Sequence, residues 1–558
     1  MTEIRRPRWL KWLPIALGAI VLASVLVPLA AFYRYRSKAR EKAIEALEER
    51  FDQVRLEDLQ LKLLPGPLVF PRIAAFGRDL SISLPERGED VPPFLSTSEF
   101  EVEMSLLGLL RDPIRIERLR LEGLEIQIPP KREGDSKGPR TAPETPFLVE
   151  DLVADGAVLR ILPKNPEKTP LQYDMHELRV QSAGLGEPMR FDTTLENAKP
   201  PGQIQSEGYF GPLELYDAGA SPVSGEYIFE RADLSVFGGI AGTLYSEGRY
   251  AGVLERIEVD GFTRTPDFQL ESAGNPVDLR TDFHAIVDGT NGDTLLQPVD
   301  ALLGSSGFQA RGGVAQQPGT KGKTVCVDAE GDQGRIEDFL RLAMKSEEPF
   351  MVGEIRFRSI VLIPPGDVDV AQKLFLDGEF MIDSASFPEP KVQNKIEELS
   401  EAAQGKNSEE EAVSALRDER VFSDMRGSFR LENGAMYLSY LSFRVPGADV
   451  WLEGTYGLLD QQIDLRGELR LDANVSELTS GVKSFFLKLV DPLFERKDAG
   501  AVIPIRIGGA PDKPSFGVEL GRVFSREEVA RPNAAAAEGG QWTKNIPTCS
   551  GIFEAQAE

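Results

Sequence analysis

The stretch from Ile463 to Val475, which reads IDLRGELRLDANV, decides the fold of this chain. Every second residue from Ile463 onward is apolar or glycine, and the residues between them are charged or asparagine. Side chains of a β-strand alternate between two faces, so the stretch predicts a strand with one apolar and one charged face. At about 3.3 Å per residue the strand would extend about 40 Å, and we expect it to belong to an antiparallel sheet with one solvated face.

The composition of the whole chain is that of a folded, acidic protein. Its 558 residues predict two to four domains or one elongated repeating body. A hydrophobic content of 41% and a charged content of 27% are typical of a folded protein. The formal net charge of -26 argues against nucleic acid as a partner, because a phosphate backbone requires a basic surface.

The N-terminal region predicts a membrane anchor. Residues 12–33 are apolar and uncharged over a length that crosses one bilayer, and Trp12, Phe32 and Tyr33 stand at its ends, where aromatic belts form. A cleaved signal peptide is the alternative interpretation. Basic residues flank the segment on both sides, so charge alone does not orient it.

The residues after the anchor predict a helical stalk that leads into a β body. Residues 34–54 are charged, with an apolar stripe at helical spacing that includes Ile44, Leu47 and Val54. From residue 55 the period changes to two, which predicts strands in an N-terminal and middle region (55–345) and in a C-terminal region (346–524). We therefore expect a mainly β protein, built on an elongated, curved antiparallel sheet that forms a groove.

Acidic–glycine pairs punctuate this β body. Asp155-Gly156 and Asp377-Gly378 are of the type that occupies hairpin turns, and we predict turns there. A loose repeat relates residues 119–130 to residues 152–163, each with a central acidic–glycine pair and a strand ending in proline, as hairpin addition would produce.

Three segments interrupt the alternation. Residues 129–146 predict a polar loop rich in proline, and residues 388–420 predict an inserted helical segment. Residues 525–558 have no periodicity and predict a disordered tail.

Residues 476–490 predict an amphipathic helix. Its apolar stripe at helical spacing consists of Leu478, Val482, Phe485, Phe486 and Leu489. This helix either plugs the end of the sheet or meets a membrane or a partner.

The sequence contains no convincing catalytic or metal-binding motif. Ser480 and Lys483 match S-x-x-K without its partner motifs, and Gly322-Lys323-Thr324 lacks the first glycine of a phosphate-binding loop. The two histidines, His176 and His284, are isolated in the sequence. We therefore expect no enzyme, no metal and no cofactor. The two cysteines, Cys326 and Cys549, could pair, but their number implies no disulfide framework.

Two parts of the chain resemble the AsmA-like family. Residues 429–520 carry the main likeness, and the elements that carry it are Asn433-Gly434, Gly454-Thr455-Tyr456, Asp464-Leu465-Arg466-Gly467, Asp491-Pro492-Leu493-Phe494, Ile503-Pro504 and Ile507-Gly508. The anchor, the stalk and residues 92–130 are similar to the N-terminal layout of that family. The likeness is weak over residues 165–345.

This resemblance implies a function and a location. AsmA-like proteins are similar to repeating β-groove, bridge-like lipid transfer proteins, anchored in the bacterial inner membrane with the body in the periplasm and linked to phospholipid movement and outer-membrane homeostasis. Residues 1–11 would then be cytoplasmic, and the partners would be phospholipid, the inner membrane and other envelope proteins.

The leading hypothesis is a groove whose apolar floor holds lipid acyl chains without any bond being made or broken. The candidate floor positions are Ile463, Leu465, Leu469, Leu471, Leu374, Leu376, Phe380, Ile382, Val450 and Leu452. The alternative is a structural or assembly factor for outer-membrane proteins, in which the same apolar faces close into a dry core.

Overall fold

The computed structural model describes residues 34, 38–48, 53–64, 72–83, 92–105, 108, 113–128, 147–162, 170–184, 186–214, 217–317, 320–388, 423–445, 448–471, 502–511, 513–518, 542 and 546–550. The expected anchor (12–33), the expected insertion beyond Pro388 and the expected amphipathic helix (476–490) lie outside these residues. None of the helices in the described ranges is long and apolar enough to cross a membrane.

The protein is mainly β, as predicted, and its described strands belong to one large mixed sheet. The chain divides into two compact units. The first unit comprises residues 1–230, 247–259 and 287–292, and the second comprises residues 231–246, 260–286 and 293–558. The domain boundary expected at residue 345 lies inside the second unit.

The elements of the first unit are α2 (Ala39–Glu48), β1 (Gln53–Arg55), β2 (Asp58–Leu64), β3 (Arg72–Ser83), β4 (Leu95–Ser105), β5 (Ile114–Glu122), β6 (Glu125–Ile128), β7 (Phe147–Ile161), β8 (Leu171–Ala183), β9 (Met189–Ala198), β10 (Pro201–Phe210) and the 3-10 helix η4 (Ala218–Ala220). Four strands contribute residues to both units: β11 (Pro222–Asp233), β13 (Thr243–Val253), β14 (Arg256–Leu270) and β15 (Val277–Val287).

The elements of the second unit are the 3-10 helix η5 (Leu234–Phe237), β12 (Ile240–Ala241), β16 (Thr294–Leu303), β17 (Ser306–Ala315), β18 (Thr324–Arg335), α3 (Ile336–Ala343), β19 (Val352–Ile363), α4 (Val370–Lys373), β20 (Phe375–Ser386), β21 (Ser423–Glu432), β22 (Ala435–Val445), β23 (Ala448–Gly457), β24 (Ile463–Leu471), β25 (Val502–Ala510) and β26 (Lys513–Val518).

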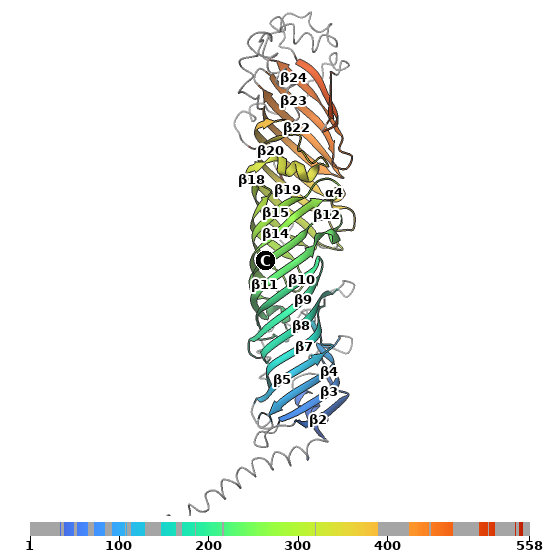
Figure 1. Cartoon of the computed structure of the whole chain (residues 1–558), viewed down its shortest axis with the longest axis vertical. Coiled ribbons are helices and arrows are strands. Elements are labelled where there is room, and N and C mark those ends of the chain that lie inside the picture. Colours follow the sequence, from blue (N-terminus) through green and yellow to red (C-terminus); the bar gives the residue numbers. More distant parts are fainter. Residues whose placement is uncertain are drawn as a thin grey trace, which may run out of the picture. The chain divides into compact units, whose positions relative to one another are not determined.

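Consecutive strands of the second unit pair with one another in chain order (Figure 1). From β16 to β26 each strand is antiparallel to the next. The opening stretch of the sequence forms β24 over Ile463–Leu471, and its last four residues lie outside the described chain. Antiparallel pairing allows short connections between neighbouring strands, as between β21 and β22.

The prediction of a wholly antiparallel sheet is wrong in the first unit. Strands β5 and β6 both pair with β7 in parallel. A parallel neighbour requires a connection of about a dozen residues or more. Residues 129–146, the proline-rich segment recognised in the sequence, provide that length between the end of β6 and the start of β7.

The sequence repeat corresponds to two strands that lie side by side. Glu122 is opposite Asp155 in the parallel pair, so the glycines that follow them are neighbours. Gly123 has φ +62° and Gly156 has φ +69°, a backbone region that glycine enters at little cost. The turn predicted at Asp155-Gly156 is therefore wrong, because Gly156 lies inside β7.

At each of these two glycines the alternation of side chains between the two faces of the strand changes phase, so that residues three apart lie on the same face. Leu121 and Leu124 lie on either side of Gly123, and both belong to one hydrophobic cluster with Ala154 and Ala157. The apolar side of this part of the sheet therefore continues past the glycines.

Helix α2 forms only part of the expected stalk. Its stripe residues Ile44 and Leu47 pack against Val54 and Ile82. Val54 itself lies in β1, opposite Ile82 of β3, so the prediction of a helix through residue 54 is wrong at that end. A β-branched residue with an apolar cross-strand partner favours the strand.

Part of the expected disordered tail packs on the second unit. Cys549 forms a disulfide with Cys326, and the two cysteines are 223 residues apart in the sequence. The backbone N–H of Cys549 donates to both carboxylate oxygens of Asp328 at 3.1 Å. The prediction of a disordered tail is therefore wrong for residues 546–550. The disulfide and the hydrogen bonds to the Asp328 carboxylate hold this segment against the second unit.

Candidate functional site

The second unit presents a continuous uncharged face over seven strands, β20 to β26. Directly opposed residues of paired strands lie on the same face, so the strand register defines rows that cross the sheet. The four rows, in strand order, are Leu376, Leu431, Met436, Tyr456, Ile463, Gly509 and Pro514; Gly378, Phe429, Leu438, Gly454, Leu465, Ile507 and Phe516; Phe380, Gly427, Leu441, Leu452, Gly467, Ile505 and Val518; and Ile382, Met425, Phe443, Val450, Leu469 and Ile503. We call these residues the apolar face.

The apolar face alternates glycines with large side chains. Phe380 lies opposite Gly427, and Phe429 lies opposite Gly378. A Cβ atom built on either glycine would come within 2.7 Å of the opposing ring. The rings therefore occupy the space above the glycines, as aromatic side chains do when they cover glycine in a sheet. This explains why Asp377-Gly378, predicted as a turn, lies within β20.

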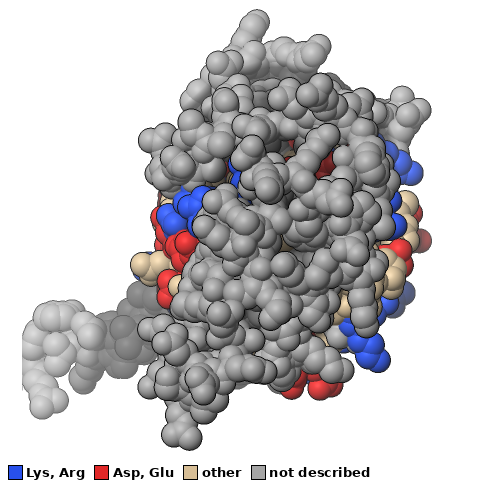
Figure 2. Space-filling view, turned by 90° about the horizontal axis from the view of Figure 1, so that it is seen from above, with Lys and Arg blue, Asp and Glu red and all other residues tan. Residues whose placement is uncertain are grey.

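The other face of the same strands is charged and paired. Arg358 contacts Glu379 at 3.5 Å, and Arg430 contacts Asp377 at 3.1 Å, each across a pair of strands. Arg506 contacts Asp464 at 3.0 Å further along the sheet. Figure 2 shows basic and acidic side chains interspersed on the visible described surface. The two-sided pattern of the opening stretch therefore extends across the second unit.

Eight of the ten candidate floor positions lie on the apolar face: Ile463, Leu465, Leu469, Leu376, Phe380, Ile382, Val450 and Leu452. Leu471 lies opposite Ala448 and begins a further row. Val450, Leu452, Leu465 and Leu469 are 1%, 5%, 8% and 2% exposed, so this part of the face is well buried.

Leu374 precedes β20 and packs against the first row of the apolar face. It follows helix α4 as its C-cap, and its N–H donates to the carbonyl oxygen of Val370. Its side chain is buried with Val370, Leu431 and Leu458. The strand predicted from residue 373 begins at Phe375, because a one-turn helix capped by Asp369 precedes it.

Two short helices cover the β18–β21 end of the apolar side. Phe339 of α3 packs against Phe357 of β19 with ring centroids 5.0 Å apart, and Phe380 and Ile382 belong to the same cluster. Helix α4 contributes to a second cluster that includes Leu376. At this end the chain itself fills the space over its apolar side.

The apolar face is accessible at some positions and buried at others. Phe380, Phe429, Leu438, Ile505 and Ile507 are all half-buried. Phe516, in the last described strand, is 48% exposed and lies directly opposite Ile507. The uncharged rows run from β20 to β26, which at about 4.8 Å per strand is about 29 Å. The buried side chains of Leu441, Leu452 and Leu465 interrupt the accessible residues along the two central rows.

The first unit has apolar rows of the same kind. One row runs through Gly77, Phe100, Leu121, Ala154 and Leu178, and a Cβ on Gly77 would meet the ring of Phe100.

This row becomes polar toward β11. It continues through Thr193, Ser206 and Tyr227, and the Ser206 hydroxyl lies 2.7 Å from the hydroxyl of Tyr250. Burial raises the pKa of Tyr250. The alternating pattern of the sequence did not predict this pair of hydroxyl groups, because Ser206 and Tyr250 lie in strands that are distant in the sequence.

The histidine and lysine candidates within the described chain lie beside carboxylates. The described residues contain no group of three or more His, Cys, Asp or Glu side chains that could hold a metal ion. His284 contacts Asp260 at 2.8 Å, and Lys323 of the incomplete phosphate-loop motif pairs with Asp293 at 3.1 Å. Ser480 and Lys483 lie outside the described residues.

The remaining sequence candidates also lie outside the described chain. These are the helix positions Leu478, Val482, Phe485, Phe486 and Leu489 and the anchor positions Trp12, Phe32 and Tyr33.

Comparison with known proteins gave no match. No family model, no curated protein and no solved structure shows a significant similarity to this chain.

Proposed function

We propose that this protein holds phospholipid acyl chains on its apolar face and carries them between the inner and outer membranes of a bacterial envelope. Anchored in the inner membrane with its body in the periplasm, it performs no chemistry and supports outer-membrane homeostasis. The observation that carries the proposal is the set of uncharged rows across β20 to β26, in which Phe429, Leu438 and Ile507 are half-buried and Phe516 is exposed.

The dimensions of these rows suit this ligand. A bilayer core is about 30 Å thick and consists of two leaflets, so one acyl chain extends about 15 Å. Rows of about 29 Å accommodate that length. Burial of each CH₂ group is worth about 0.8 kcal/mol, so bound chains are retained and net flow requires a gradient or a partner.

The disulfide supports the location. Disulfides persist in oxidising compartments such as the bacterial periplasm and are rare in the cytosol. Cys326 and Cys549 form such a bond, and both cysteines are buried. The resemblance to AsmA-like proteins in residues 429–520 points to the same compartment.

Photo-crosslinking in cells tests the proposal. A crosslinking amino acid at Leu465 or Leu469 should capture phospholipid, because both side chains belong to the apolar face. The matched controls are Arg466 and Arg470, which alternate with them along β24 and should capture none. Absence of lipid at both leucines, with capture at a bilayer-facing control site, rules the proposal out.

The alternative is a structural or assembly factor with a closed core. The packing of α3 and α4 over the β18–β21 end favours it, because there the chain covers its own apolar side. In this case the leucine sites would crosslink only to the protein itself, and outer-membrane proteins would be captured from the charged face.

A further inference from the structure

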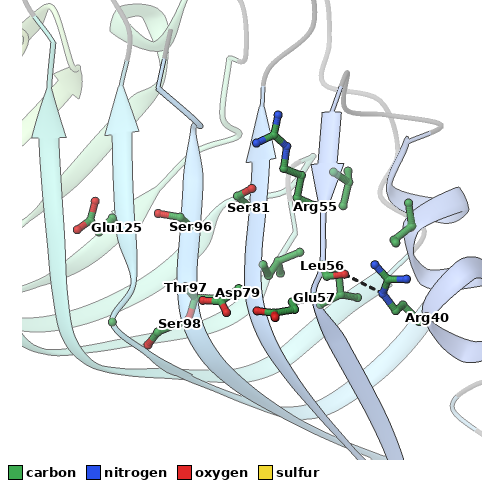
Figure 3. A pocket seen from close by; sticks show the side chains of 14 residues that line it. Arg40, Arg55, Leu56, Glu57, Asp79, Ser81, Ser96, Thr97, Ser98 and Glu125 are labelled. Carbon is green, nitrogen blue, oxygen red and sulfur yellow. Dashed lines mark hydrogen bonds between the residues drawn. The ribbon is translucent and has the colours of Figure 1, made fainter. Parts of the chain in front are cut away.

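A hollow of about 720 Å³ lies beside helix α2 in the first unit (Figure 3). Its polar side chains do not converge on one point. Arg40 donates to a backbone carbonyl oxygen at 2.8 Å, and Glu57 forms a hydrogen bond with Asp79. Arg55 lies on the face of β1 opposite Val54, the residue against which α2 packs. The second unit presents a more definite arrangement.

Strands that are far apart in the sheet meet on the apolar side of the second unit. Ile240 of β12 and Leu270 of β14 belong to one hydrophobic cluster with Tyr456 of β23. Strands β15 to β22 lie between β14 and β23 in the order of pairing, so the sheet curls until its distant strands approach each other. Helix α4 lies beside β12 at this point, where the Val370 N–H donates to the carbonyl oxygen of Gly238 at 3.0 Å (Figure 1).

The end of helix α3 is held from both sides by side-chain amides. Asn275, in the connection between β14 and β15, donates to two carbonyl oxygens just beyond the helix, each at 2.8 Å. Gln461, in the turn between β23 and β24, donates to the carbonyl oxygen of Ala343 at 3.1 Å and accepts from the N–H of Lys345 at 3.2 Å. We call α3, α4, residues 271–275 and residues 457–462 the clasp.

The clasp is closed beneath these amides by apolar contacts. Phe339 of α3 lies against Phe357, and Val370 and Leu374 at the two ends of α4 are buried. An acyl chain can replace such contacts without leaving a buried polar group unpaired. A ligand shifts a conformational equilibrium only by binding one state better. An acyl chain would bind the open clasp better, because it covers the apolar surface that opening exposes.

The clasp has the properties of a segment that opens locally. Helix α3 has 8 residues and α4 has 4, and helices this short are not stable without packing. Gln461 adopts φ +56°, a region that a residue other than glycine keeps only where its surroundings hold it. Opening the turn would release that strain. Elements held by few contacts open at a lower free energy than the strands of a sheet.

We propose that the clasp is a gate for acyl chains on the apolar side of the second unit. When closed, it separates the apolar side of β16–β18 from that of β22–β26. An acyl chain that reaches Phe339, Val370 or Leu374 opens the gate by taking the place of their contacts. The inference rests on the proposed function and assigns the step at which passage along the sheet is controlled.

Hydrogen exchange of the full chain in lipid nanodiscs tests the opening itself. Amides of α3 should exchange at least about tenfold faster than those of β22 and β23. Gln461→Gly removes the side-chain amide and suits the positive φ, so exchange in α3 should rise by a further factor of about three while β22 and β23 stay unchanged. Gln462→Gly, at the exposed neighbouring position, is the matched control and should leave α3 unchanged. Exchange of α3 only together with β22 and β23, or no effect of Gln461→Gly, overturns the gate.

A covalent bridge across the clasp tests the passage of lipid. Lys345→Cys combined with Gln461→Cys places two thiols where the side chain of one residue meets the backbone of the other. The two native cysteines are paired and buried, so a short bifunctional thiol reagent bridges the introduced pair. The same variant without reagent stays free to open. Asp464→Cys with Arg506→Cys, bridged in the same way on the charged face, is the matched control.

Photo-crosslinkers at Val314 and Leu469 report lipid on the two sides of the clasp, in cells grown with radiolabelled phosphate. Val314 of β17 lies in a row that continues to Ile363, which packs in the clasp cluster, whereas Leu469 lies in β24. We expect the bridge to lower lipid capture at one of the two sites at least about tenfold and to leave the other unchanged. The control bridge should change neither.

The remaining outcomes separate the gate from the proposed function. Unchanged capture at both sites overturns the gate and leaves the proposed function standing. Loss at both sites also overturns the gate, because the clasp would then support the whole apolar side and not divide it. Absence of lipid at both sites without the reagent removes the proposed function itself.

Discussion

The ring of Phe380 on β20 covers Gly427 on β21, the residue directly opposite it in the sheet. A Cβ atom at position 427 would lie 2.7 Å from two ring carbons of Phe380 and 3.0 Å from the carbonyl oxygen of Tyr440. The ring and a neighbouring backbone would both have to move. We therefore expect Gly427→Ala to lower the free energy of unfolding by about 1–3 kcal/mol, measured by chemical denaturation.

Gly517→Ala is the matched control for this substitution. Gly517 also lies in a strand of the second unit, and a Cβ atom built on it meets nothing within 4 Å. Its effect should be within about 0.5 kcal/mol. Equal effects of the two substitutions would mean that loss of backbone freedom, and not the ring, decides the outcome.

The ion pair between Asp377 and Arg430 provides a second prediction. The Asp377 side chain is only 3% exposed, whereas Arg430 is 52% exposed. Arg430→Met keeps most of the apolar stem but removes the charge that faces a buried carboxylate. We expect a loss of about 2 kcal/mol in the free energy of unfolding, measured by denaturation at low and high salt.

An exposed pair on the same face serves as the comparison. Arg506 and Asp464 are 49% and 46% exposed, so Arg506→Met should cost about 0–1 kcal/mol and lose its effect in salt. The prediction fails if Arg506→Met costs as much as Arg430→Met.

The disulfide provides a third prediction. Cys326 and Cys549 are 0% and 1% exposed, so a reductant reaches the bond only after residues 546–550 detach. We expect Cys549→Ser to lower the free energy of unfolding by about 2–4 kcal/mol, measured by thermal melts without reductant. Reductant added to the folded wild type should leave its melting temperature unchanged over short incubations.

Mass spectrometry after alkylation checks the pairing itself. The chain has two cysteines, so non-reduced, unfolded wild type should take up no alkylating agent. Uptake of two equivalents would contradict the bond between Cys326 and Cys549.

Alternation along the chain was sufficient to predict much of the apolar face. Leu465 and Leu469 were assigned to one face of a strand from period two alone, and the register places them opposite Gly454 and Val450. Which strands are neighbours could not be predicted, because pairing depends on contacts between distant residues. The parallel placement of β7 beside β5 is the clearest case.

Glycine was the main source of wrong local predictions. Asp377-Gly378 has the composition of a turn, but Gly378 lies in a strand under the ring of Phe429. The sequence shows that glycine is present without showing whether a turn or a nearby ring requires it.

Tyr456 provides a prediction about pH. Burial, followed by the charge of Asp460, raises the pKa of Tyr456 to about 12 from the usual 10. A raised pKa in the folded state means that the unfolded chain loses the proton first, so the associated stability is complete below pH 10 and is lost as the pH rises toward about 12. The Tyr456 hydroxyl also donates to the carbonyl oxygen of Ala343 at 3.0 Å.

Tyr456→Phe separates these two contributions. At neutral pH the variant should be about 1 kcal/mol less stable than wild type, because it lacks the hydrogen bond to Ala343. Between pH 10 and about 12 the wild type should lose stability that the variant does not, so the difference between them should narrow. Denaturation curves at several alkaline pH values measure that difference, and ultraviolet titration of the tyrosines assigns it to Tyr456. A constant difference across this range would mean that Tyr456 ionises at the same pH in the folded and the unfolded chain.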